Sequence, residues 1–204
     1  MSHFVIEDPF WALFPEASIG VVLAKGINNR QVPDAAHAEI AGYLAEGTRG
    51  AQKHLGAEVF SENPAVAVWR AAYRRFKTTK GARASIESLL KRAAQGQDVG
   101  GINPLVDPYN AVSLCHGLPC GGADLASFSG DLRLTVTAGG DPFIPLGADE
   151  NEPTLQGEVC YLYEIGAGCR CWNWRDGKRT MLTETTTEAV LIIENGDPAR
   201  AADM

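Results

Sequence analysis

The spacing of apolar residues changes near Gly117, and this change constrains the fold more than any other feature of the chain. Before Gly117, apolar residues recur mainly three and four positions apart, which is the spacing of an amphipathic helix. After it, they alternate with polar residues or form short β-rich runs, which is typical of strands. One strand, predicted as buried, precedes the helices at Ser18–Ile27 (SIGVVLAKGI). This order predicts an α+β fold in which helices pack on a largely antiparallel sheet system.

Capping residues place the individual elements. Asn63 is expected to cap a helix with Pro64 in its first turn, and Gly96 to end a helix that starts at Ser85. Further helices are expected at Pro33–Ala45, Thr48–Leu55 and Tyr109–His116. Strands are expected at Asp131–Thr137, Glu158–Ile165, Cys169–Trp174, Arg179–Thr183 and Ala189–Glu194, with an Asp-Gly turn at 175–178.

The length of 204 residues favours one domain, expected to span 1–204. No apolar run approaches the roughly 20 residues that cross a bilayer, so no membrane partner is expected. The first eight residues lack the basic and apolar regions of a signal peptide. Five cysteines make an odd number without a regular framework, which favours reduced thiols and a cytoplasmic location.

The segment from Trp69 to Arg92 is strongly basic within an acidic chain. It has eight basic residues and one acid, Glu87, which is a net charge of +7 against −7 for the whole chain. Val66, Trp69, Tyr73 and Phe76 form an apolar stripe at helical spacing, which predicts a core face rather than a base-stacking platform. A second stripe carries the charges, and it is either a solvated helix face or a surface for an anionic partner. Its candidate RNA-binding residues are Arg70, Arg74, Arg75 and Lys77.

The most informative stretch is Asn103–Asp124, in which a capped helix precedes glycines. Asp107 is expected as the N-cap and Pro108 as the first helical residue, with Gly117 as the left-handed stop. Residues 118–124 (LPCGGAD) are expected to form a loop whose free N–H groups bind a carbonyl or carboxylate. The same composition also suits any tight loop.

Asn103–Asp124 (NPLVDPYNAVSLCHGLPCGGAD) resembles the B3/B4 domain of the phenylalanyl-tRNA synthetase β subunit, which has a V-D-x-T-N segment followed by L-x-L-G-x-P-x-x-x-x-D. The chain is closer still to freestanding B3/B4 proteins. Their pattern resembles it at Ser85–Arg92, Ile102–Asp124, Gly157–Val159 and Trp172–Asp176. The resemblance covers about residues 69–194 and implies a β-sandwich stacked with a helical layer.

In the synthetase, this domain is an editing module that hydrolyses mischarged tyrosyl-tRNA. Carried over by position, the pocket residues fall on Tyr109, Asn110, Gly121, Cys171, Trp172 and Glu194. Asn110 is a direct match, whereas Tyr109 stands in place of Thr and Gly121 in place of a loop His. The large Tyr109 and Trp172 reshape such a pocket, so the tyrosine specificity does not transfer.

The resemblance implies a trans-acting aminoacyl-tRNA deacylase with tRNA as its partner and no cofactor. Expected catalytic residues are Asn110, Gly121 and Gly122, and expected substrate-binding residues are Tyr109, Ser113, Cys171, Trp172 and Glu194. The alternatives are a non-catalytic module that binds an amino acid or another small molecule, and an RNA-binding accessory protein. A basic stripe beside the pocket favours RNA, whereas a distant or ion-paired stripe favours the small molecule.

Other sites are disfavoured by spacing. Cys160, Cys169, Cys171 and His116 match no standard zinc motif. Cys115 and His116 are helix neighbours that point about 100° apart, so they do not make a nucleophile–base pair. Cys120, beside the glycines, is the better thiol candidate, although no base is identifiable from the sequence.

Overall fold

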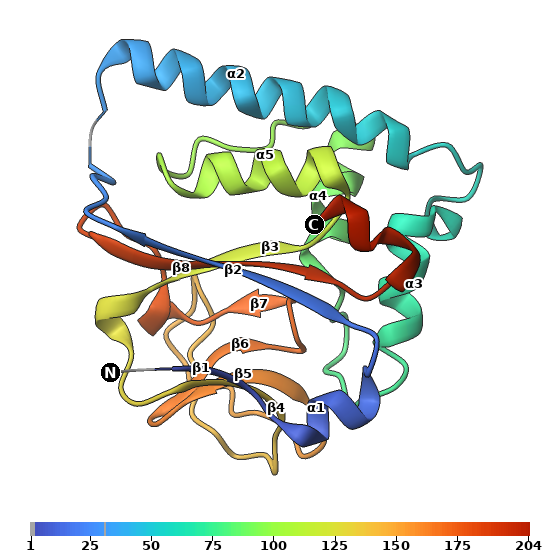
Figure 1. Cartoon of the computed structure of the whole chain (residues 1–204), viewed down its shortest axis with the longest axis vertical. Helices are drawn as coiled ribbons and strands as arrows, with labels where there is room; N and C mark the ends of the chain where they lie inside the picture. The colour runs from blue at the N-terminus through green and yellow to red at the C-terminus, as the bar shows by residue number, and fades with distance from the viewer. Residues whose placement is uncertain (1–2, 31) are drawn as a thin grey trace.

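The computed structural model describes residues 3–30 and 32–204, which form three layers (Figure 1). Helices α2 (Asp34–Gly50) and α5 (Val106–His116) make the first layer. A three-stranded sheet makes the middle layer, and a five-stranded sheet the third. The α+β class and the sandwich with a helical layer are confirmed.

The middle sheet has the order β2-β8-β3 and is antiparallel throughout. Its strands are β2 (Ser18–Lys25), β8 (Glu188–Asn195) and β3 (Cys120–Asp124). β8 is central, and its apolar run suits a position with a neighbour on each side. The prediction that residues 118–124 form a loop is therefore wrong. Cys120–Asp124 is a strand that pairs along its length with β8.

The lower sheet has the order β1-β4-β5-β6-β7. Its strands are β1 (Phe4–Ile6), β4 (Leu132–Val136), β5 (Val159–Tyr163), β6 (Gly166–Arg170) and β7 (Arg175–Asp176). β1 runs parallel to β4, while the other pairs are antiparallel. Strand β1 and the following helix α1 (Asp8–Leu13) were not predicted, because three residues are too few to show a period.

Helices α3 (Pro64–Ala72) and α4 (Ser85–Ala94) cover one end of both sheets (Figure 1). The predicted apolar stripe is confirmed at Val66 and Trp69, which are fully buried in the core. The ring of Trp69 packs edge-on against Trp172, with centroids 4.9 Å apart. Short 3-10 helices complete the chain at Ala51–His54, Phe60–Glu62, Leu125–Ser127, Lys178–Thr180 and Pro198–Asp203. None of the described helices has both the length and the apolarity needed to cross a membrane.

Four predictions of elements or their bounds are wrong, and one of them is the strand expected at Arg179–Thr183, where Lys178–Thr180 forms a 3-10 helix. α2 continues to Gly50 and leads directly into a 3-10 helix, so Thr48–Leu55 is no separate helix. α5 begins at Val106 because the side-chain oxygen of Asn103 accepts the N–H groups of residues 105 and 106, while the Asp107 carboxylate accepts those of 101 and 102. Residues 171–174 form a turn and 175–176 a strand, the reverse of the expected arrangement.

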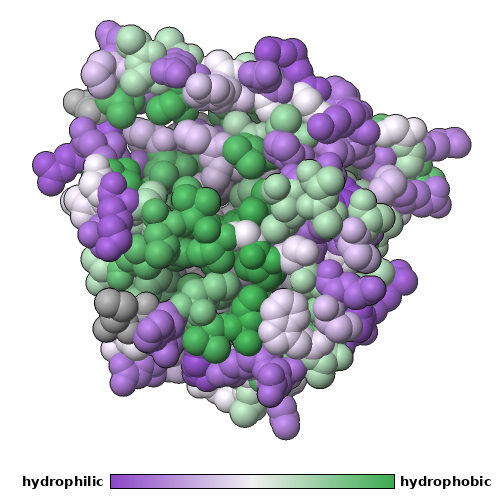
Figure 2. All heavy atoms as spheres, in the orientation of Figure 1, coloured by the Kyte–Doolittle hydropathy of each residue, from purple (hydrophilic) through white to green (hydrophobic). Residues whose placement is uncertain are grey.

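The prediction that Ser18–Ile27 is buried is also wrong, since β2 is an edge strand. Val22 and Leu23 are 58% and 62% exposed, although they belong to opposite faces of the sheet. Figure 2 shows a hydrophobic area across this face of the molecule, where β2 runs in Figure 1. The strand lacks charged residues before Lys25, so it is a sheet edge without the usual protection against pairing.

Candidate functional site

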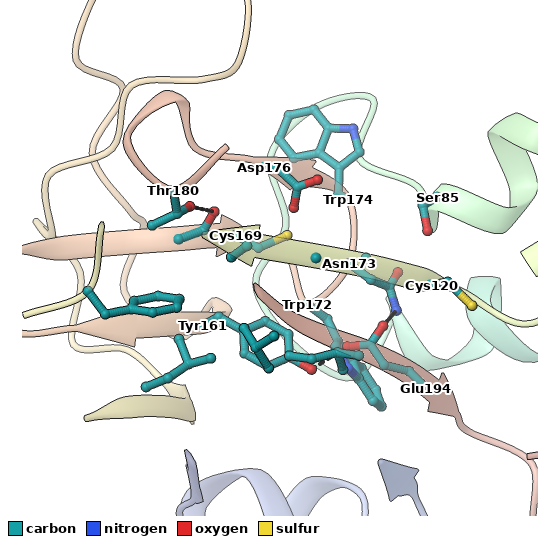
Figure 3. A pocket seen from close by; sticks show the side chains of 18 residues that line it. Ser85, Cys120, Tyr161, Cys169, Trp172, Asn173, Trp174, Asp176, Thr180 and Glu194 are labelled. Atoms are coloured by element: carbon teal, nitrogen blue, oxygen red, sulfur yellow. Dashed lines mark hydrogen bonds between the residues drawn. The ribbon is translucent and has the colours of Figure 1, made fainter. Parts of the chain in front are cut away.

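A narrow cavity lies between the two sheets, at the end that α4 covers (Figure 3). One wall comes from β3 and β8, and the other from β5, β6 and the turn that leads into β7. The centre of a water molecule can reach a volume of about 90 Å³ inside this cavity. Since one water needs roughly 10–15 Å³ by this measure, the cavity has room for a few waters or a small side chain.

Glu194 is the most buried acid of this cavity. Register in the sheet directs it there, because Glu194, Ile192 and Val190 alternate along one face of β8. Its carboxylate accepts hydrogen bonds from the Tyr161 hydroxyl and, at 2.6 Å, from Asn173 Nδ2 (Figure 3). Burial raises the pKa of Glu194 from 4.5 to about 7, and the hydrogen bonds from these donors oppose that rise.

Asn173 is itself held by residues at the ends of two helices. Its Oδ1 accepts a hydrogen bond from the Tyr73 hydroxyl at 3.0 Å, and its backbone oxygen accepts the Ser85 N–H at 3.0 Å. Tyr73 follows directly on α3, and Ser85 begins α4. Tyr73 therefore orients the amide that binds Glu194, while Ser85 holds the backbone of the same residue.

Asp176, on β7, is a second acid of the cavity. It is half-buried beside Cys169 and Trp174, and burial raises its pKa. The negative charge of Asp176 also contributes to the raised pKa of Glu194. Among the residues described, the cavity lining includes no Lys, Arg or His. The cavity thus contains two carboxyl groups and no basic side chain.

Strand β3 is an edge strand, so alternate backbone N–H groups near this site have no partner in the sheet. The N–H of Glu194 donates to the Pro119 carbonyl at 3.0 Å, which makes this a hydrogen-bonded pair of the β3–β8 ladder. Residues of an antiparallel strand alternate in this respect, so Gly121 also faces β8 and Gly122 faces the open edge. The two glycine amides point in opposite directions, so at most one of them can bind a given oxyanion.

The structure brings together four of the eight predicted pocket residues. Gly121, Gly122, Trp172 and Glu194 line the cavity. A Cβ added at Gly121 would meet nothing within 4 Å, whereas one at Gly122 would lie 2.7 Å from a side-chain atom of Leu191. Gly121 therefore opens the cavity wall.

The three predicted residues on α5 lie behind the cavity wall. Asn110 is 8% exposed and shares the buried face of the helix with Ser113, whose hydroxyl donates to the Leu118 carbonyl at 2.6 Å. Burial raises the pKa of Tyr109, with a further contribution from the charge of Asp176. The charge of Asp176 thus affects the pKa of Tyr109, although Tyr109 does not line the cavity.

Cys171 points away from the cavity. Its thiol donates to Glu158 Oε1 at 2.8 Å, beside the buried ion pair that Glu158 forms with Arg170. Cys171 and Trp172 have φ angles of +47° and +64°, a left-handed conformation that is uncommon for residues other than glycine. This turn inserts the indole of Trp172 between the sheets, where it packs on Phe14 with ring centroids 4.5 Å apart.

The predicted RNA-binding residues separate into two pairs. Arg70 and Arg74 line a surface cleft between α3 and α4. Arg75 instead lies over the ring of Phe14, 4.6 Å from its centroid. Lys77 is not part of the cleft, and its backbone N–H donates to the Gly157 carbonyl.

The cleft itself is basic and adjoins the cavity. Arg83 lines it, and Lys91 lines a second cleft that shares Arg70, Arg83 and Glu87 with the first. Arg70 Nη2 forms an ion pair with Glu87 at 2.7 Å. Ala84 borders the cleft and the next residue, Ser85, lines the cavity.

Four residues of this site were not assigned in the sequence: Asn173, Asp176, Ser85 and Tyr161. The first three lie in motifs that were singled out, Trp172–Asp176 and Ser85–Arg92. The role of Asp176 was missed because this residue was expected in a turn, whereas it pairs with Cys169 across β6 and β7.

The thiols at this site are poor nucleophiles. Burial raises the pKa of Cys120 to about 12, so that its thiolate is scarce at neutral pH. All five cysteines are free. Cys169 lines the cavity while Cys171 turns toward Glu158, so the two diverge. Within residues 3–30 and 32–204, no group of three or more His, Cys, Asp or Glu side chains has the geometry of a metal site.

The chain matches a known protein family. Residues 68–204, more than half of the chain, match the family model described as "B3/4 domain". This range includes every residue that lines the cavity. No curated protein matches the chain.

Proposed function

The chain belongs to the B3/4 domain family, and from this membership we propose that it is a freestanding aminoacyl-tRNA deacylase that hydrolyses the ester of a mischarged tRNA in trans. The cavity between the sheets is the observation that carries the proposal. It joins the glycines of β3, the Trp172–Asp176 motif and Glu194, three parts of the family pattern that lie far apart in the sequence.

In this proposal the cavity binds the aminoacyl group and excludes longer side chains by its size. Glu194, oriented by Asn173 and Tyr161, accepts a hydrogen bond from the bound group. Water attacks the ester carbon, and the C–O bond to the ribose breaks to give a free amino acid and a ribose hydroxyl. The Gly122 amide at the open edge of β3 is the candidate donor to the oxyanion that develops.

An aminoacyl ester is activated, so positioning and oxyanion stabilisation replace a strong nucleophile. The neighbouring ribose hydroxyl of the tRNA can assist the proton transfer. This suits a site whose Cys120 thiol is held protonated by burial. Asn110 has a supporting position in this proposal, behind β3, rather than a place in the wall.

The basic cleft supports RNA as the carrier of the ester. Arg70, Arg74 and Arg83 line it next to the cavity, so a phosphate backbone bound there would lead toward Ser85. We expect Arg74→Glu to weaken tRNA binding and to reduce its salt dependence. Arg49→Glu, which is exposed on α2 and outside this cleft, is the control. Equal salt dependence in both variants would remove the cleft from the proposal.

Gly121→Leu tests the cavity itself. A Cβ at Gly121 meets nothing within 4 Å, and the rest of the leucine side chain extends from it into the cavity. We expect the variant to fold and to lose deacylation in a screen against a complete set of aminoacyl-tRNAs. Gly42→Leu is the matched control, because Gly42 lies exposed on α2 and its added Cβ also meets nothing within 4 Å. Hydrolysis that persists in Gly121→Leu, or is absent from the wild type, contradicts the proposal.

A second candidate is a non-catalytic module that binds a free amino acid or a similar small molecule. The Arg70–Glu87 ion pair favours it, because Glu87 neutralises part of the cleft. The same variants separate the candidates. For a small-molecule module, we expect Gly121→Leu to abolish ligand binding and Arg74→Glu to leave it unchanged. No aminoacyl-tRNA is hydrolysed in that case.

A further inference from the structure

Asp176 is the acid of the cavity that the proposed ester hydrolysis does not use. It lies on β7, and Figure 3 shows its carboxylate beside Trp174, on the other side of Asn173 from Glu194. Asp176 is more exposed than Glu194, which is 3% exposed. Asp176 is therefore the carboxylate that a bound molecule reaches more easily.

No basic side chain compensates Asp176. In the described part of the chain no side chain forms a regular hydrogen bond with its carboxylate, although the Cys169 thiol lies close enough to oppose part of the rise in its pKa. The neighbouring Arg175 lies over the Trp174 ring instead, 5.8 Å from its centroid, and forms no ion pair with Asp176. Since a buried carboxylate without a partner is unfavourable, the position gains most from a cation that arrives with the ligand.

Other polar atoms of the cavity also lack partners. The Ser85 hydroxyl is buried, lines the cavity and has no hydrogen-bond partner. Trp172 is fully buried, and its Nε1 approaches Glu194 without hydrogen-bonding geometry. In folded proteins nearly all such groups are paired, so these atoms are available to hydrogen-bond a polar ligand or water in the cavity.

We propose that Asp176 binds an ammonium group, and that the cavity therefore selects ligands with a primary amine at the Asp176 end and a hydrogen-bond donor or small group at the Glu194 end. The ring of Trp174, beside Asp176, adds a face on which a cation is attracted. In the deacylase proposed above, on which this identification of the ligand rests, the ammonium is that of the aminoacyl ester.

Amino-acid amides test this directly, because they retain the ammonium group and are not hydrolysed as esters are. The experiment titrates the folded protein with amides of all the standard amino acids, and with the same amides acetylated on the amine. Calorimetry or the fluorescence of the cavity tryptophans reports binding. We expect at least one amide to bind, and its acetylated form to bind about tenfold more weakly or worse.

Asp176→Asn keeps the shape of the side chain and removes its charge. We expect it to weaken the amide about tenfold and to leave the acetylated form unchanged. Asp149→Asn is the control, since Asp149 is an exposed acid paired with Lys178. The comparison of the two probes on the wild type requires no variant, so it decides the question even if Asp176→Asn does not fold.

Equal binding of acetylated and free amides, or unchanged binding by Asp176→Asn, overturns the role of Asp176. So does a panel in which no amide binds. Failure of the deacylase has a different signature: amides bind and depend on Asp176, but no aminoacyl-tRNA is hydrolysed. In that case the ammonium site stands and the reaction does not.

Discussion

Replacing Glu194 by Gln is expected to remove a pH dependence from the stability of the protein. Glu194 is 3% exposed, and the side chains that hydrogen-bond to it, Tyr161 and Asn173, bring no positive charge. Gln has nearly the same shape, and one of its two polar atoms still accepts a hydrogen bond from Tyr161. The substitution therefore deletes the titration while it preserves most of the packing.

The size of the effect follows from the pKa. Burial raises the pKa of Glu194 from 4.5 to about 7, so folding favours the protonated form. Below pH 4.5 the group is protonated in both states and costs nothing. As the pH rises toward 7, the unfolded chain loses this proton first, and the free energy of unfolding falls. At about 1.4 kcal/mol per pKa unit, the full loss is about 3 kcal/mol, and it stays constant at higher pH.

Urea unfolding, monitored by tryptophan fluorescence at intervals from pH 4.5 to 8, measures this pH dependence of the free energy of unfolding. The informative quantity is the difference in unfolding free energy between wild type and variant, since all other carboxyl groups titrate in both. We expect that difference to shift by about 3 kcal/mol in favour of Glu194→Gln between pH 4.5 and 7.5. Glu150→Gln, at an exposed position, is the matched control. A flat difference for Glu194→Gln would refute the assignment of a raised pKa to Glu194.

Two further predictions concern stability. Glu158→Gln leaves the buried guanidinium of Arg170 with a neutral partner, and we expect a loss of about 3–5 kcal/mol in urea unfolding; a loss below about 1 kcal/mol would show that the pair is hydrated. Asn103→Ala removes the acceptor for the N–H groups of Leu105 and Val106, and we expect a loss of about 1 kcal/mol; an unchanged midpoint would place the N-terminal cap of α5 elsewhere.

The apolar pattern predicted those parts of the fold whose burial is one-sided. The stripe with Val66 and Trp69 on α3, and the alternation in β4, gave the right elements because one face of each is buried. The pattern failed for Ser18–Ile27, since an apolar run does not reveal whether its strand is central or at an edge. The exposed Val22 and the buried Val190 belong to equally apolar sequences, and only their places in the sheet differ.

The Asp-Gly turn signal led to a wrong prediction of where the chain reverses at the site. Asp176 precedes a glycine, which is a common hairpin signal, yet here Asp176 pairs in β7 and the chain reverses at Cys171 and Trp172. Neither Cys nor Trp is typical of a left-handed turn, so propensity could not have located it. The packing of Trp172 against Phe10, Phe14 and Trp69 maintains this conformation, and those contacts come from segments distant in the sequence.

This turn is also what makes the cavity. A regular strand through residues 169–174 would place Cys169, Cys171 and Asn173 on one face. In the folded chain, the left-handed residues direct Cys171 to Glu158 and return Asn173 toward Glu194, which leaves Cys169 beside Asp176. The side chain that orients one acid and the strand that positions the other therefore both depend on a conformation that Trp172 stabilises from the core. A single core residue links the stability of the fold to the geometry of the site, so substitutions at Trp172 are expected to affect ligand binding and unfolding together.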